Sequence, residues 1–198
     1  LDSNASGSNA LVYSEGMNTV VPGGANWKST VSTMGQCTGK FYFETKIIGS
    51  SGNWWVGIMD PSEVQYYSTN RKISEYPRGY GFTANLSKGN NGSEVAWGYS
   101  TSIGQNDIIC VAVDLTNSKI YTRKNGDAWA NTTASPAGDP TSGSTGTGSA
   151  YTLTQNGGSN INYVPAVSCY DTTAKLSCNF GAGYFGTTAV ASAGTNAS

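Results

Sequence analysis

The chain has 198 residues, of which 37% are hydrophobic and only 12% are charged, and its formal net charge is -1. This balance excludes the basic surface that nucleic acid or an anionic membrane would need, and no apolar run approaches the roughly 18 residues of a membrane-spanning helix. Twelve Tyr and five Trp supply enough apolar surface for a sizeable core, and the length suits a single all-β domain.

Short β-strands, with no helix between them, are predicted along most of the chain. Turn residues separate them at short spacing, which is typical of a β-sandwich or a barrel. The segment 53–60 is apolar on both faces, as a central strand covered on both sides would be. Within it, the adjacent Trp54 and Trp55 must point to opposite faces of the sheet. In chain order the predicted strands lie within 10–21, 39–48, 53–60, 79–84, 94–100, 107–115, 119–124, 163–170 and 175–181.

Turn residues lie on both sides of the strand at 119–124. Thr116–Ser118 precedes the strand, and Asn125–Gly126 follows it. Asn-Gly is the strongest short indication of a hairpin, because a type I′ turn needs a positive φ at both central residues. The pattern predicts a meander of short antiparallel strands.

The four cysteines indicate core positions rather than a metal site. The chain has no CxxC pair and no His, so the spacing does not fit zinc. A hairpin through 171–174 would put Cys169 and Cys178 on one apolar face, where they would be small core residues. Cys110 lies in an apolar strand, and Cys37 has no obvious partner. Free thiols would fit folding in a reducing cytoplasm; a Cys169–Cys178 disulfide is the alternative if the register differs by one or two residues.

Two stretches interrupt the run of strands. Residues 60–78 combine polar, aromatic and basic residues, and residues 130–160, mostly Ala, Gly, Ser, Thr, Asn and Pro, predict a long flexible loop or an insertion. The tail has no core-forming pattern, and the first residue is Leu rather than Met. We therefore expect one domain over 1–186, a tail over 187–198 at a fragment boundary, and a parent chain that is longer or processed.

Five segments occur in a fixed order along the chain: TGKFYFETKI, WWVGIMD, GYGFTAN, NDIICVAVDLTNSKIYTRKNGDAW and YVPAVSCYDTTAKLSCNFG. Together, over about residues 35–181, they resemble the SPRY domain. That family has a Gly-Lys-aromatic-Tyr-aromatic-Glu strand, an aliphatic strand running into Val-Gly, a Leu-Asp turn followed by Lys-Asn-Gly, and a closing pair from Pro-Ala-Val to Asn-Phe-Gly. Each piece alone is common, but the ordered set is specific.

The resemblance implies a bent sandwich of two antiparallel sheets of the concanavalin A-like kind, with loops at one edge forming the binding surface. Three positions depart from the family: Asn106 and Cys110 stand where it tends to have Gly, and Thr122 replaces an aromatic residue. These departures weaken the inference that this chain binds peptides as animal members of the family do. The loops are low in charge and rich in Gly, Ser, Thr and Asn. In this composition, and in the flanking segments, the chain is most similar to SPRY-like domains of tailed-phage structural proteins.

The carboxylates do not form the pairs that catalysis needs. Concanavalin A-like glycosidases project two carboxylates from one strand face, yet Glu44 is alone in its strand, and Asp107 and Asp114 lie at opposite ends of theirs, roughly 23 Å apart. Without His, the usual serine and cysteine hydrolase arrangements are excluded. The Gly-rich 88–92 lacks the Lys-Ser/Thr of a phosphate loop, and no Asp array suggests calcium. We therefore predict no enzymatic activity, no metal site and no cofactor.

The stretch 60–78 is the predicted recognition site, because no other loop combines aromatic area, guanidinium donors and length. The alternative is that its aromatic residues only cover the edge of the sandwich. Trp129, which follows the Asn125–Gly126 turn, would extend the patch. The predicted ligand-binding residues are Tyr66, Tyr67, Arg71, Tyr76, Arg78 and Trp129.

The phage-like style predicts a non-enzymatic structural or recognition domain of a virion, in a fibre, a tail or the capsid surface. Its partners would be other virion proteins or a host-surface glycan or protein, with no nucleic acid and no membrane insertion. The domain would belong to a larger chain or a homo-oligomer, assembled in the host cytoplasm and exposed on the particle. Two alternatives stay open: an architectural domain whose loop packs against a neighbouring subunit, and a cellular SPRY adaptor that binds a short peptide.

Overall fold

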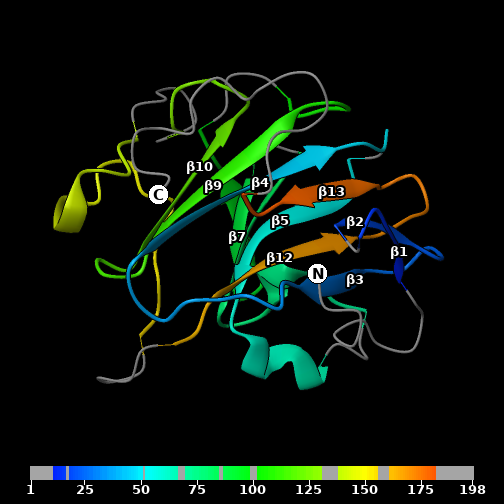
Figure 1. Cartoon of the computed structure of the whole chain (residues 1–198), viewed down its shortest axis with the longest axis horizontal. Helices are drawn as coiled ribbons and strands as arrows, with labels where there is room; N and C mark the ends of the chain where they lie inside the picture. The colour runs from blue at the N-terminus through cyan, green and yellow to red at the C-terminus, as the bar shows by residue number, and fades with distance from the viewer. Residues whose placement is uncertain are drawn as a thin grey trace.

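Two antiparallel β-sheets pack face to face in the computed structural model of the chain (Figure 1). The structure describes residues 11–16, 18–50, 52–66, 70–84, 87–98, 102–130, 138–155 and 161–181, and only the backbone of residues 64–66. In these residues the helical segments are short 3₁₀ turns. The prediction of an all-β, two-sheet antiparallel sandwich is confirmed.

Sheet A holds seven of the described strands. Its centre is the long pair of β4 and β9, in register from Lys40 opposite Asp114 to Lys46 opposite Ile108. The spatial order is β1 (Leu11–Ser14), β2 (Thr19–Pro22), β13 (Leu176–Asn179), β4 (Lys40–Ile47), β9 (Ile108–Asp114), β10 (Lys119–Lys124) and β11 (Tyr151–Thr152).

Sheet B holds the other six described strands, and β12 and β5 lie at its centre. They pair over six residues, from Val164 opposite Met59 to Cys169 opposite Trp54. The spatial order is β3 (Lys28–Val31), β12 (Val164–Cys169), β5 (Trp54–Met59), β6 (Gly79–Thr83), β7 (Ser87–Asn90) and β8 (Ser93–Ala96).

The principal core lies between the two sheets. Alternate residues of β4 and β9 face it, among them Phe43 and Val111, and Trp54 fills it from sheet B. Each large side chain buried in this way contributes about 1.5–3 kcal/mol of hydrophobic stabilisation. Apolar residues alternate with other residues over 39–48 because one face of β4 lies on this core and the other face is turned away from it.

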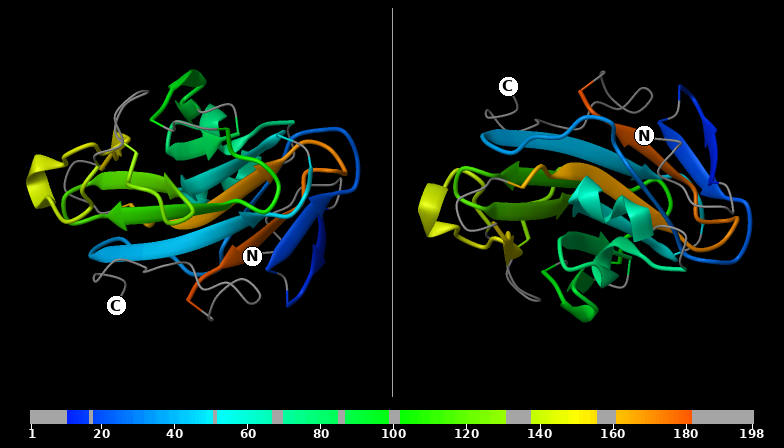
Figure 2. Two further views of the ribbon diagram at one scale, coloured as in Figure 1. Left: turned by 90° about the horizontal axis from the view of Figure 1, so that it is seen from above. Right: turned by 90° about the horizontal axis from the view of Figure 1, so that it is seen from below.

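A second apolar layer covers the other face of sheet B. Trp55 packs there against Ile73 and Tyr76, which belong to the segment around the 3₁₀ helix η3 (Ile73–Glu75). Figure 2 shows this short helical segment on the side of sheet B that faces away from β4. The prediction that Trp54 and Trp55 point to opposite faces is confirmed, and both are buried. β5 is covered on both faces, which explains why 53–60 is apolar throughout.

The predicted hairpin of the last two strands is wrong. β12 pairs with β3 and β5 in sheet B, whereas β13 pairs with β2 and β4 in sheet A. The turn at 171–174, held by hydrogen bonds from Thr173 and Ala174 to the Asp171 carboxylate, passes from one sheet to the other. Two strands that face one core from opposite sheets have the same apolar alternation as a hairpin, so the pattern could not separate them.

Cys169 and Cys178 nevertheless both face the principal core, and each is a free thiol. Burial raises the pKa of both, that of Cys178 to about 11, so both stay protonated near neutral pH. A protonated buried thiol is a poor nucleophile. The two residues are small core residues, as the sequence indicated.

The predicted turn at Asn125–Gly126 is present, since the Asp127 N–H donates to the Lys124 carbonyl at 3.0 Å, but it is not of type I′ and no paired strand follows it directly. Of the pair, only Asn125 has a positive φ, 50°. Its side chain holds the start of β9 instead, because Oδ1 accepts from the Ile108 N–H at 2.8 Å and Nδ2 donates to Asp107 at 2.9 Å. The next partner of β10 is β11, some 25 residues later in the chain. By contrast, the predicted turn at 116–118 does connect β9 to β10.

Part of the stretch predicted as a long loop consists of ordered turns. Asp139 accepts hydrogen bonds from the backbone N–H and the hydroxyl of Thr141. A 3₁₀ turn, η4 (Gly143–Thr145), follows, and then β11 adds two residues to the edge of sheet A.

Candidate recognition site

The segment that leads from β5 to β6 is anchored on the outer face of sheet B. The Ile73 N–H donates to the Ser168 hydroxyl at 2.9 Å, and the Ser29 hydroxyl donates to the Arg71 carbonyl at 3.0 Å. Ile73 and Tyr76 are fully buried against the sheet. These bonds tie the segment to β12 and β3, so its remaining side chains are presented from a fixed backbone.

Two glycines of sheet B make this close packing possible. A Cβ atom on Gly81 would lie 2.9 Å from the Trp55 ring, and one on Gly89 would lie 2.6 Å from Ser74 Cβ. Real Cβ atoms do not approach other atoms so closely. A side chain at either position would therefore push the segment away from the sheet.

Arg78 binds two buried carboxylates at one end of the segment. Its Nε lies 2.9 Å from Asp60 Oδ2 and 3.4 Å from Glu63 Oε1, and its backbone N–H donates to Glu63 Oε2 at 3.3 Å. Burial raises the pKa of Glu63, and the nearby Asp60 charge raises it further, while Arg78 opposes both effects. The arginine therefore holds together two acids that would otherwise repel each other.

Arg71 stacks on the buried ring of Tyr76. Its guanidinium carbon lies 4.5 Å from the centre of the ring, and Nη2 donates to the Glu75 carbonyl. Stacking and this hydrogen bond fix the plane of a half-buried guanidinium group, which can offer further N–H donors to a ligand.

These side chains line one open pocket of about 570 Å³. Guanidinium, hydroxyl and amide groups supply donors and acceptors, and the carboxylate of Glu63 adds an acidic group. Such a rim suits the backbone and polar side chains of a peptide, since its groups can donate and accept in turn. The lining residues are Ser62, Glu63, Arg71, Tyr76, Pro77, Arg78 and Asn91.

The structure brings together three of the six predicted site residues. Arg71, Tyr76 and Arg78 line the pocket, although Tyr76 is buried and contributes its floor rather than an exposed ring. Tyr67 and the side chain of Tyr66 lie outside the described residues. Ligand binding by these residues stays a prediction.

Trp129 does not extend this patch. It lies on sheet A, where its ring meets the Tyr42 ring edge-on at 6.4 Å and covers the guanidinium group of Arg123 at 4.8 Å. The Ala130 N–H donates to the Thr122 carbonyl at 2.9 Å, which holds Trp129 beside β10, so closeness to the Asn125–Gly126 turn in sequence did not place Trp129 near 60–78.

Four lining residues were not among the predicted site residues: Ser62, Glu63, Pro77 and Asn91. The first three lie within 60–78. That short segment holds three acids and two arginines, and this mixture of charges could have identified Glu63. Asn91 comes from the turn between β7 and β8, where it has a positive φ of 50°. Nothing in the sequence relates that turn to the segment 60–78. The two meet only in the fold, where the backbone N–H of Asn91 donates to the Tyr76 carbonyl at 3.2 Å.

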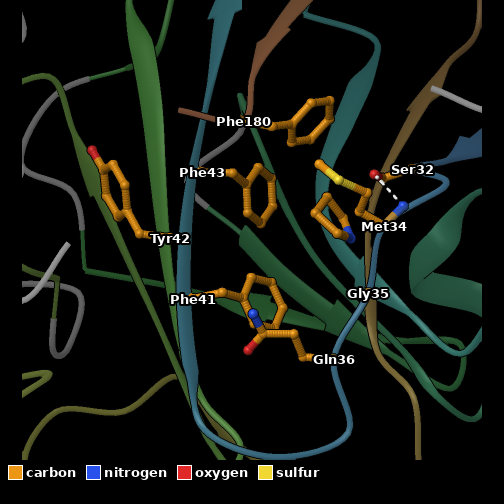
Figure 3. Close-up of a pocket in the computed structure, with 9 residues that line it drawn as sticks. Ser32, Met34, Gly35, Gln36, Phe41, Tyr42, Phe43 and Phe180 are labelled. Atoms are coloured by element: carbon orange, nitrogen blue, oxygen red, sulfur yellow. Dashed lines mark hydrogen bonds between the residues drawn. The ribbon is translucent and has the colours of Figure 1, made fainter. Parts of the chain in front are cut away.

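A second, more apolar pocket of about 190 Å³ opens between the sheets (Figure 3). Phe41, Phe43 and Phe180 point into it from sheet A, while Tyr42 points to the other side of β4. Met34, 64% exposed, closes it from the loop after β3. The pocket borders the principal core, and its polar residues Ser32 and Gln36 carry no charge, unlike the guanidinium groups of 60–78.

Among the residues that the structure describes, no three His, Cys, Asp or Glu side chains are grouped to hold a metal ion. In the same residues there is no helix with the length and apolar character to cross a membrane.

Comparison with solved structures identifies the fold. The SPRY domain of human HERC1 superposes with a TM-score of 0.62 at 14% sequence identity, covering 92% of this chain and 99% of that one. A second human SPRY domain gives a TM-score of 0.59 at 17% identity, covering 88% and 97%. This chain has the SPRY fold. No protein-family model and no curated protein matches the sequence, so the structural likeness to SPRY domains, at this low identity, concerns the fold.

Proposed function

We propose that this SPRY-fold chain is a non-enzymatic recognition domain that binds a segment of a partner protein in the pocket of 60–78. The observation that carries the proposal is the Arg71 guanidinium group, stacked on buried Tyr76 and directed by one backbone hydrogen bond. A fixed, planar donor group in an open polar pocket is the kind of residue that dominates protein recognition. The fold adds support, because the resemblance to SPRY domains implies protein binding at loops.

A photo-reactive amino acid placed at Asn91 tests this proposal. Asn91 lines the pocket and is exposed, so on irradiation it should cross-link to a single partner in extracts of the organism or host that supplies the protein. The matched control places the same amino acid at Val12, which is 54% exposed on the edge of sheet A. The cross-link should disappear when Arg71→Ala is added. Equal cross-linking from Val12, or a cross-link that Arg71→Ala leaves unchanged, would refute the pocket as the site.

We further propose that the domain is displayed on a phage virion. The support is the composition of the loops, which are low in charge and rich in Gly, Ser, Thr and Asn. Peptide mass fingerprints of purified virions should contain this chain. Its consistent absence from virions would leave the alternative, a cellular adaptor that binds a short peptide through the same pocket. A host-surface glycan or protein would be the partner in the first setting, and a cellular protein in the second.

A further inference from the structure

We propose that the end of sheet B around Trp27 and Tyr170 is a binding site for neutral carbohydrate. Its residues do not line the pocket of 60–78, although Asn70 comes from the same segment, and the proposal goes beyond the protein recognition proposed there. It lies where β3 begins, β12 ends and β5 begins, and its residues come from four connecting segments that are distant in sequence.

The register of three strands brings these segments together. Lys28 of β3 and Trp54 of β5 both lie opposite Cys169, the last residue of β12. The residues one or two steps beyond this row are therefore neighbours: the Asn26 N–H donates to the Tyr170 carbonyl at 2.9 Å, and the Tyr170 N–H donates to the Asn53 carbonyl at 3.1 Å. These bonds continue the ladder past the strand ends and fix the backbone of the site.

Two aromatic rings form the apolar part of the site. The Trp27 and Tyr170 rings lie 5.4 Å apart, tilted by 56°, and both side chains are half-buried. Trp27 packs on the second apolar layer of sheet B, and Lys72 Nζ lies 5.5 Å from its ring. Packing from below holds the indole in place, so the rings are arranged before any ligand binds.

The segments that carry the two rings also hold polar side chains. Asn70 is exposed, and its Oδ1 accepts from the backbone N–H of Trp27 at 2.6 Å, which fixes the position of its amide. Asn53 Nδ2 donates to Asp171 Oδ2 at 3.0 Å. Asn26, also exposed, adds a third amide to the residues held next to Tyr170.

This combination matches the chemistry of a pyranose. The sugar presents a face of C–H groups, which an electron-rich aromatic face attracts, and a rim of hydroxyl groups, each a donor and an acceptor. Amides and carboxylates complement such hydroxyls because an amide both donates and accepts. Among the nearby charges, Lys72 is paired with Glu94, and the Asp171 carboxylate accepts hydrogen bonds from Asn53 and Thr173. The site therefore favours a neutral sugar over a charged ligand.

Binding to an array of neutral hexose and N-acetylhexosamine oligosaccharides tests the proposal, followed by titration of the best binder in solution. Wild type should bind at least one of them. Trp27→Ala and Tyr170→Ala should each weaken binding at least tenfold. Trp27→Phe keeps an apolar ring on the second layer and should weaken binding several-fold with little change in thermal melting, which separates loss of stacking from loss of fold.

Two controls make the outcome specific. Trp129→Ala removes a comparable half-buried indole from sheet A and should leave saccharide binding unchanged. Arg71→Ala should abolish the partner cross-link at Asn91 yet also leave saccharide binding unchanged, so failure of one proposal does not imply failure of the other. The carbohydrate proposal is overturned if no oligosaccharide on the array binds, or if Trp27 and Tyr170 variants bind as wild type does.

Discussion

The Arg71 guanidinium carbon lies 4.5 Å from the centre of the Tyr76 ring, and that ring is buried between the segment 60–78 and sheet B. One residue of the pair therefore serves the pocket and the other serves the core. The two contributions can be separated by mutation, because only Tyr76 fills space that the fold needs.

Arg71→Ala should cost only about 1 kcal/mol of unfolding free energy, the value of a partly exposed cation–π contact, while abolishing partner binding. Tyr76→Ala should cost about 3–5 kcal/mol, because it leaves a large cavity over Trp55. Chemical denaturation of both variants measures the two costs. Equal costs would mean that Arg71 is a structural residue rather than a presented one.

Arg78→Ala should destabilise the fold by about 2–4 kcal/mol, because it leaves the carboxylates of Asp60 and Glu63 buried without their shared cation. Glu63→Gln should cost less, since Arg78 keeps Asp60 and one buried charge is removed. In the Arg78→Ala background, Glu63→Gln should restore part of the lost stability. A double-mutant cycle by urea denaturation measures this coupling; strictly additive effects would contradict the shared ion pair.

Gly89→Ala should lower the melting temperature by several degrees and expose the second apolar layer. The new Cβ would lie 2.6 Å from Ser74 Cβ and 2.9 Å from the Trp55 ring, so η3 must move away from the sheet. Gly24→Ala is the matched control, because no atom lies within 4 Å of a Cβ there. Differential scanning calorimetry compares the two variants, and similar melting would show that η3 adjusts freely.

Acid should weaken the fold partly through Asp114. Burial acts to raise the pKa of this carboxyl, but hydrogen bonds from Asn117 and the Lys40 charge outweigh it and hold the pKa below its usual range. A lowered folded-state pKa gives stability that is present above the unfolded-state pKa, about 3.9, and is lost as pH falls through the folded-state pKa. Asp114→Asn should therefore be less stable than wild type at pH 7, and the difference should shrink below about pH 4. A constant difference from pH 7 to pH 2 would contradict this.

The sequence by itself determined the class of fold and the ends of most strands. Alternation in 39–48 follows from one buried face, and the continuous apolar run at 53–60 follows from two buried faces, whichever strands turn out to be neighbours. Asn106, which replaces a family Gly, has a φ of 71°, a conformation that Asn tolerates better than most residues. Local chemistry explains all three observations.

Tertiary structure decided which strands share a sheet and which side chains share a site. β3 and β7, with the sequences KSTV and SKGN, carry too little apolar alternation to be predicted, and they form because the neighbouring strands β12 and β6 supply hydrogen-bond partners. The turn at 171–174 crosses between sheets although its flanks resemble a hairpin. Arg71 and Arg78 were predictable as members of one segment, but Asn91, Trp27 and Tyr170 join their sites only through strand register, which is a long-range property that no local pattern encodes.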